Sequence, residues 1–237
     1  ENIFRLVLVN TNKMISNSGL FSLTECMGLK DIYLNNIKKE TVKKIIQTKP
    51  MFNWLDEHQN YFTYYSKRNR LSNLISKVSK VSKSIEVDLL HKKIKNYPRI
   101  YNDVSYSSEI LISFCKVSFD CKIEDAKVIK FENSVSKVSD FDGYKGNFIS
   151  PNEQKLVQIF KEYGPILEYD DLKDLAKRNK VKKDSLSMIL QFSPLFHRID
   201  TGFYTLTEKL KENTLDKIIS IINLESLTFA KDECPTI

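Results

Sequence analysis

Glycine and proline are scarce in this chain, with six of each among 237 residues. So few glycines argue against glycine-rich phosphate loops, and so few turn-forming residues argue against an all-β fold with many tight turns. No apolar run approaches the roughly 18 residues that a membrane span needs. The first residues, Glu1-Asn2-Ile3, match neither a start methionine nor a signal peptide. We therefore expect a helix-rich, cytoplasmic protein without membrane segments, cut from a longer polypeptide.

Patterns for metal binding and catalysis are also missing. The four cysteines contain no C-x-x-C pair and the three histidines are scattered, so neither a zinc ribbon nor a disulfide framework fits. The sequence has no nuclease-like carboxylate pattern, nucleophile elbow or Walker loop. These absences predict a protein that is not an enzyme, with no catalytic residues, no metal site and no cofactor.

An internal repeat indicates the architecture. Residues 37–56 (IKKETVKKIIQTKPMFNWLD) align without gaps with residues 181–200 (VKKDSLSMILQFSPLFHRID), and seven of the 20 positions are identical. In both copies apolar residues recur at i, i+3 and i+4, a proline ends the helix, and an aromatic strand follows a polar turn. A helix followed by a β-hairpin is the second half of a winged helix-turn-helix.

The same pattern extends to three copies. In the last copy, Ser150-Pro151 predicts a helix start and Gly164-Pro165 its end. In the middle copy, Phe119–Ile123 and Val128–Phe131 predict the hairpin. We therefore predict an α+β fold that is mainly helical with short β-wings: three tandem winged helix-turn-helix domains plus a C-terminal helix. The expected boundaries are 1–66, 67–133 and 150–207 for the domains, 134–149 for a linker, and 208–237 for the helix and tail.

Two stretches resemble known families. Residues 152–207, with KLVQIFKEYGPILEYDDLKDLAKRN, SPLF and GFYTLT, resemble the HARE type of helix-turn-helix domain, as in the delta subunit of bacterial RNA polymerase. Residues 61–131, with YFTYYSKRNRLSNLISKVSKVSKSIEVDLLHKKI and ILISFCKV, resemble bacterial proteins with sigma-factor-like helix-turn-helix domains. The resemblance implies a module associated with DNA or transcription, and it transfers no catalytic residue.

Positive charge is concentrated in the middle of the chain. The formal net charge is +7, and residues 67–133 hold 14 basic and eight acidic residues, which is +6 of that total. Lys77, Lys80 and Lys83 recur at period three, which predicts a basic ridge along a helix, suited to the phosphate backbone of a duplex. A solvated helix face is the alternative. Further candidates for phosphate contacts in this stretch are Arg68, Arg70, Lys92 and Lys93.

The helix before each hairpin is the expected base-contacting element, because that helix of a winged helix enters the major groove. Its candidate residues in the first copy are Lys38, Lys39, Lys43, Lys44 and Gln47, and in the last copy Lys182, Lys183 and Gln191. Glutamine can bond adenine through two hydrogen bonds, which makes Gln47 and Gln191 candidates for base recognition. Their presence in both copies is equally explained by descent from one unit.

The favoured hypothesis is a non-catalytic DNA-binding region of a larger bacterial or phage protein, which grips duplex DNA through tandem winged helices. One alternative is a protein-interaction scaffold that contacts RNA polymerase or another partner. A second is the DNA-recognition part of a nuclease. The C-terminal helix is expected to pack against the last domain, and a homodimer contact through it is the alternative.

Overall fold

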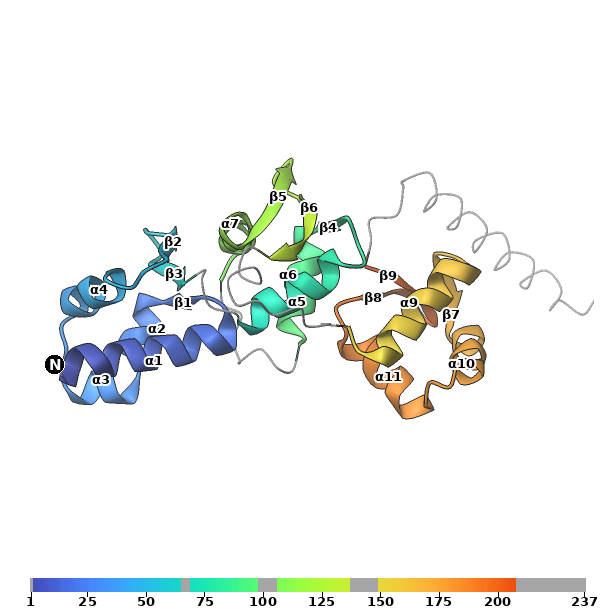
Figure 1. Cartoon of the computed structure of the whole chain (residues 1–237), viewed down its shortest axis with the longest axis horizontal. Coiled ribbons are helices and arrows are strands. Elements are labelled where there is room, and N and C mark those ends of the chain that lie inside the picture. The colour runs from blue at the N-terminus through green and yellow to red at the C-terminus, as the bar shows by residue number, and fades with distance from the viewer. Residues whose placement is uncertain (1, 65–68, 98–105, 137–148, 208–237) are drawn as a thin grey trace, which may run out of the picture.

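The described part of the chain forms three small antiparallel sheets of three strands each, arranged in a row along the long axis (Figure 1). The computed structural model describes residues 2–64, 69–97, 106–136 and 149–207. We call residues 2–64 the first unit, 69–97 with 106–136 the second, and 149–207 the third. In each unit a short strand pairs with the second strand of the hairpin, which gives the orders β1-β3-β2, β4-β6-β5 and β7-β9-β8.

The first unit consists of α1 (Asn2–Ser18), β1 (Phe21–Ser22), α2 (Leu23–Met27), α3 (Lys30–Leu34), α4 (Lys39–Gln47), β2 (Phe52–Asp56) and β3 (Tyr61–Tyr64). Helix α2 begins at a capping box, because the Ser22 hydroxyl accepts the Glu25 amide proton and the Glu25 carboxylate accepts the Ser22 amide proton. Helix α4 buries Val42, Ile45 and Ile46, which is the predicted apolar stripe.

The second unit consists of α5 (Arg70–Ser79), β4 (Ser84–Glu86), α6 (Val87–Lys95), α7 (Ser108–Ser118), β5 (Phe119–Glu124) and β6 (Val128–Ser136). Asn69 caps α5, because its side-chain oxygen accepts the Ser72 amide proton at 2.7 Å. Between β5 and β6, Asp125 and Ala126 both have positive φ in a tight turn, which the Lys127 amide closes by donating to the Glu124 carbonyl.

The third unit consists of α9 (Pro151–Tyr163), β7 (Ile166–Glu168), α10 (Tyr169–Arg178), α11 (Lys183–Phe192), β8 (Phe196–Asp200) and β9 (Phe203–Leu206). Helix α9 begins where Ser150-Pro151 predicted it, with Ser150 and Glu153 forming a second capping box. Gly164 ends α9 at φ +130, a conformation that a side chain would strain.

The sequence repeat is also a repeat of structure. Helices α4 and α11 begin at equivalent residues, and β2 and β8 begin and end at equivalent residues, 144 positions apart. Asn36 and Lys180, which precede these helices, both adopt left-handed φ values, 54° and 58°. Each hairpin has a register shift at the same place, between Trp54 and Asp56 in one copy and between Arg198 and Asp200 in the other. The predicted helix-hairpin element is therefore confirmed in both copies.

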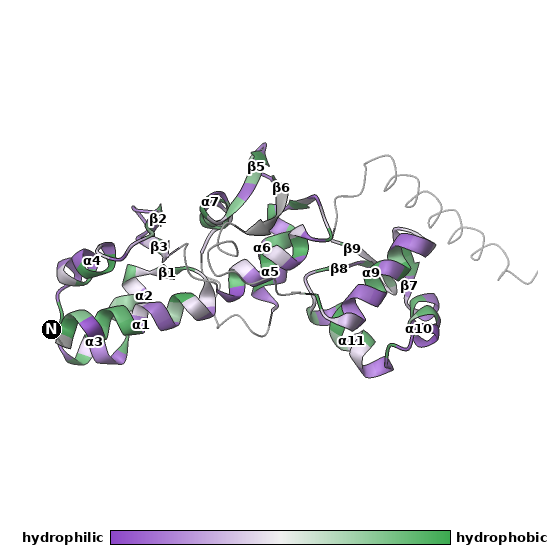
Figure 2. Ribbon diagram, viewed as in Figure 1, coloured by the Kyte–Doolittle hydropathy of each residue, from purple (hydrophilic) through white to green (hydrophobic). Residues whose placement is uncertain are grey.

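Each unit has a hydrophobic cluster of its own, and Figure 2 shows hydrophobic residues recurring along the helices that cover the sheets. Phe62 and Tyr64 of β3 are fully buried in the first cluster. Their rings pack against Phe52 with centroids 5.7 and 6.3 Å away. These two aromatic side chains therefore belong to the core of the first unit and are not available to stack on nucleic-acid bases.

The first and second units meet at a close backbone approach. Leu20 and Leu55 of the first unit belong to the hydrophobic cluster of the second. Gly19 has φ +90, and a Cβ on it would lie only 2.4 Å from the Cβ of Leu71. Helix α5 can therefore lie against this turn only because residue 19 has no side chain.

The second and third units meet at a buried polar contact. Lys77 Nζ of α5 lies 2.9 Å from Glu153 Oε1 of α9, and the Ser193 hydroxyl donates to the same carboxylate oxygen at 2.6 Å. Val81 packs against the hydrophobic cluster of the third unit. The carboxylate that caps α9 thus also joins the two units.

The structure confirms an α+β combination of helices with small sheets and corrects one boundary. Strand β6 extends to Ser136, so the predicted linker at 134–149 begins too early. The strand continues because a bulge allows Phe119 to pair with Ser136. The predicted C-terminal helix, Arg68 and linker residues 137–148 lie outside the described residues. Among the described helices, none has the length and apolar character needed to cross a bilayer.

Candidate nucleic-acid interface

The exposed side of α4 carries most of the cations predicted for the first unit. Because Val42, Ile45 and Ile46 point into the core, the opposite side faces water. We call this exposed surface the α4 face; it carries the predicted Lys38, Lys39, Lys44 and Gln47, and with them Thr41 and the acidic Glu40. The structure thus brings these predicted residues together on one surface.

Lys43 differs from its neighbours on α4 because it is half-buried. Its Nζ lies 3.3 Å from Glu57 Oε1 in the hairpin turn and 5.3 Å from the centre of the Trp54 ring. The lysine therefore connects α4 to the β2-β3 hairpin through an ion pair and a cation–π contact.

The corresponding helix of the third unit, α11, also exposes its predicted residues. Leu186 and Leu190 are buried, which leaves Lys182, Lys183 and Gln191 in solvent. Helices α4 and α11 belong to units at opposite ends of the row (Figure 1). Gln47 and Gln191 therefore belong to different units.

The predicted basic ridge on residues 77–83 is wrong. Helix α5 ends at Ser79, so Lys80 caps it and Lys83 lies beyond it, immediately before β4. The Lys77 side chain is only 13% exposed, because it points toward Glu153. The period-three pattern indicated a long exposed helix, whereas the chain turns after Ser79 and the third unit covers the first of the three lysines, Lys77.

Other candidates in the second unit lie on separate surfaces. Arg70 is exposed at the first residue of α5, and Lys80 and Lys83 are exposed between α5 and β4. Lys92 and Lys93 lie in the last turn of α6, on the side toward the third unit. The Lys93 ammonium donates a hydrogen bond to the carbonyl of Phe196 in β8.

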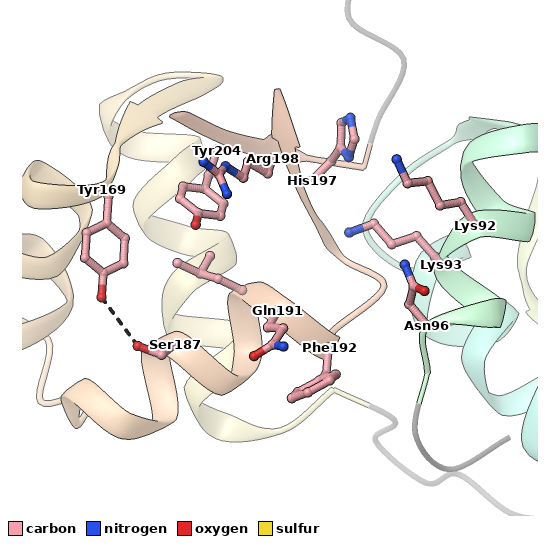
Figure 3. A pocket seen from close by; sticks show the side chains of 11 residues that line it. Lys92, Lys93, Asn96, Tyr169, Ser187, Gln191, Phe192, His197, Arg198 and Tyr204 are labelled. Carbon is pink, nitrogen blue, oxygen red and sulfur yellow. Dashed lines mark hydrogen bonds between the residues drawn. The ribbon is translucent and has the colours of Figure 1, made fainter. Parts of the chain in front are cut away.

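A pocket of about 640 Å³ opens where α6 faces the third unit (Figure 3). Its lining residues come from α6, β7-α10, α11 and the β8-β9 hairpin: Lys92, Lys93, Asn96, Tyr169, Ser187, Leu190, Gln191, Phe192, His197, Arg198 and Tyr204. We call it the junction pocket. Figure 3 shows Lys92 and Lys93 extending from α6 toward the hairpin that carries His197.

The charged groups that line the junction pocket are all basic. Two lysines, one arginine and one histidine line it, and no carboxylate is among its described lining residues. Burial, with a contribution from Lys92, lowers the pKa of Lys93 to about 8. Burial and the charges of Lys93 and Lys92 lower the pKa of His197. The pocket therefore disfavours its own positive charges when no anion is present.

Polar and aromatic groups complete the wall. The Tyr169 and Ser187 hydroxyls lie 3.4 Å apart, and the Tyr169 and Tyr204 rings have centroids 6.1 Å apart. Arg198 Nε donates to the Asp200 carbonyl at 3.1 Å, which positions the guanidinium along β8.

Sequence reasoning placed Lys92, Lys93 and Gln191 among DNA contacts but did not bring them together. His197, Arg198 and Asn96 were not among the predicted contacts. A local pattern carries no signal for this pocket, because residues 96 and 191 become neighbours only when two units pack. Within the described ranges, no group of three histidine, cysteine or acidic side chains is arranged to hold a metal ion.

A comparison of the chain with protein-family models finds no match, and a comparison with curated proteins finds none either.

Proposed function

We propose that this chain is a non-catalytic DNA-binding region that grips duplex DNA through three winged helices in series. The proposal is supported by the threefold recurrence of one topology, in which a hairpin pairs with a short earlier strand and follows a helix. In a winged helix-turn-helix, that helix enters the major groove while the hairpin contacts the backbone.

The α4 face is the observation that carries the proposal. Three lysines and a glutamine share one exposed side of a helix, ahead of a hairpin whose turn is connected to that helix by Lys43 and Glu57. Lysines on such a helix neutralise phosphates and release counterions, while Gln47 is suited to adenine. The exposed Arg70, Lys80 and Lys83 of the second unit would add backbone contacts that do not depend on base sequence.

Three modules on one chain bind more tightly than one, because the first contact raises the effective concentration of the others. The buried contacts at both junctions would restrict how the three helices are presented to one duplex. The likeness of residues 61–131 and 152–207 to helix-turn-helix proteins is consistent with a role in transcription or DNA targeting.

The test is fluorescence anisotropy with a labelled duplex of mixed sequence at two salt concentrations. Wild type should bind with a steep salt dependence. The triple change Lys38→Glu, Lys39→Glu and Lys44→Glu should weaken binding strongly and lower the salt slope by about 0.9 for each phosphate that is no longer neutralised.

A matched control carries the same charge change elsewhere, at the exposed Lys13, Lys161 and Lys177. The control should retain most of the affinity. Equally weakened binding in the two triple variants, or no duplex binding at low salt, would overturn the proposal.

A second candidate function is a protein-interaction scaffold, favoured by exposed apolar side chains at the far end of the first unit. Phe4 of α1 is 46% exposed, and Tyr33 and Leu34 of α3 are 73% and 66% exposed. Solvent-exposed apolar groups that gather on one part of a surface mark protein contacts. The test is whether the chain binds purified bacterial RNA polymerase. Binding that is lost in the variant Tyr33→Ser, Leu34→Ser would support this function, and no binding would reject polymerase as the partner.

A further inference from the structure

The junction pocket has the size and the walls of a small-ligand site. Its volume of about 640 Å³ lies in the range of pockets that enclose small organic ligands, and it is too small for a duplex. The second and third units both line the pocket: Lys92, Lys93 and Asn96 of the second unit lie on one side, and residues of the third unit lie on the other. An occupant would therefore contact two units at once.

The charge of the pocket selects an anion. Lys92 and Lys93 of α6 extend toward His197 of β8, and Arg198, the next residue of β8, extends toward Tyr204 (Figure 3). Elsewhere the fold pairs a buried lysine with a carboxylate, as it does for Lys77, whereas this cluster has no lining carboxylate among the described residues. A phosphate would fill that role, since lysine and arginine are its usual protein ligands.

The neutral part of the wall suits a base and sugar. Tyr169, Tyr204 and Phe192 supply aromatic surface, on which nucleobases stack whatever their sequence. Gln191 and Asn96 carry amide groups that can donate to and accept from a base edge, and the Ser187 hydroxyl can do both. A bare inorganic anion would leave these groups without a ligand.

We propose that the junction pocket binds a nucleoside phosphate, with the phosphate against the α6 lysines and His197 and the base and sugar against Arg198 and the tyrosines of the third unit. The ligand is either a free nucleotide or the phosphorylated end of a nucleic acid strand. Binding would clamp the second and third units together, because its contacts come from both.

Protonation supports the same site. Lys93, whose pKa is lowered by burial to about 8, lies beside Lys92 on its own helix and near His197 on β8, and Arg198 also lines the pocket. A bound phosphate raises the pKa of both Lys93 and His197, so binding near pH 8 takes up protons, about half of one by Lys93 alone. Affinity should therefore fall as the pH rises from 7 to 9.

The experiment is isothermal titration calorimetry of the full chain with AMP, GMP, CMP, UMP and inorganic phosphate. At least one nucleotide should bind tenfold or more tightly than inorganic phosphate. Repeating the titration in buffers of different ionisation enthalpy measures proton uptake. No binding at millimolar concentrations, or equal affinity for nucleotides and inorganic phosphate, would overturn the proposal.

Two oligonucleotides distinguish the sources of the phosphate. A short single strand with a 5′-phosphate that binds more tightly than the same strand without it identifies a strand end as ligand. Tighter binding of the mononucleotides than of either strand identifies a free nucleotide. Both results support the pocket as a nucleoside phosphate site.

Variants assign the binding to the pocket. Arg198→Gln and Lys93→Gln should each weaken nucleotide binding at least tenfold, and Lys93→Gln should also reduce the proton uptake. Arg198 is exposed, so its replacement keeps the test valid if Lys93→Gln does not fold. The control, Lys161→Gln on the exposed side of α9, should bind nucleotide as wild type does. Unchanged affinity in both pocket variants would reject the site.

The duplex-binding proposal and this one fail separately. The triple change on the α4 face should leave nucleotide affinity unchanged, because that face belongs to the first unit. Arg198→Gln should leave most of the duplex affinity that depends on the α4 face.

Discussion

Lys77 and Glu153 form a buried ion pair between two units that are separated by 76 positions in sequence. Nζ lies 2.9 Å from Oε1, and the side chains are 13% and 6% exposed. The Glu153 carboxylate also accepts hydrogen bonds from the Ser193 hydroxyl and the Ser150 amide. One side chain thus caps α9, holds the turn before β8 and joins α9 to α5.

Removing the lysine leaves the buried carboxylate without its cation. We expect Lys77→Met to lower the free energy of unfolding by about 3 kcal/mol, because breaking one side of a buried pair strands the other charge. Chemical denaturation measures the decrease. Lys122→Met is the control, since Lys122 pairs with Glu132 in solvent and its removal should cause no measurable change. A decrease for Lys77→Met no larger than that of the control would contradict a buried role for the pair.

Acid should weaken the same contact. Burial alone would raise the pKa of Glu153, but hydrogen bonds from Ser193, Lys77 and Ser150 lower it below its ordinary value. The folded state therefore binds the proton less readily than the unfolded state, and the stabilisation present at neutral pH disappears as pH falls through the folded pKa. Stability curves from pH 6 to pH 3 should be steeper for wild type than for Glu153→Gln, and parallel curves would refute the assignment.

Gly19 is expected to tolerate no side chain. Gly19→Ala should destabilise the protein by about 1–3 kcal/mol more than Gly202→Ala, because its Cβ would overlap Leu71 while that of residue 202 meets open space. Both glycines have positive φ, +90 and +83, so the control carries the backbone strain alone. Thermal unfolding of the two variants gives the difference. Equal melting temperatures would show that α5 adjusts to the extra carbon.

The single tryptophan, Trp54, should report on occupancy of the α4 face. Lys43 lies over its ring, so a duplex that binds α4 would cover the half-buried indole and displace water. We expect its emission to shift to shorter wavelength on duplex binding and to stay unchanged when a nucleotide occupies the junction pocket. A duplex that binds without any change in emission would place the contact elsewhere.

Local patterns were sufficient for the repeated elements. The stripe of Val42, Ile45 and Ile46 predicted α4, and Ser150-Pro151 predicted the start of α9, because helix periodicity and capping depend on neighbours within a few residues. The first three helices were not identified, although the Ser22 and Glu25 capping box was present as a signal. On α4, the positions of the buried residues also predict which residues face solvent, so the α4 face could be predicted from the sequence.

The lysines of the middle unit show where local patterns fail. Lys77, Lys80 and Lys83 look alike in sequence, yet Lys77 is buried against Glu153 and the other two are exposed on separate parts of the chain. Lys93 is half-buried against β8, while its neighbour Lys92 remains exposed. Burial of a charge depends on which distant surface covers it, and spacing along one helix contains no information on that.

The sequence by itself determined the repeated helix and hairpin, the exposed lysines of α4 and the concentration of charge in the middle of the chain, since these depend on residue order alone. Only the tertiary structure decided which cations face solvent, which one pairs with Glu153, and which gather with His197 and Arg198 in the junction pocket. The physical reason is that the electrostatic environment of a side chain is set by all the units packed around it, and here the deciding partners lie about 80–100 residues away along the chain.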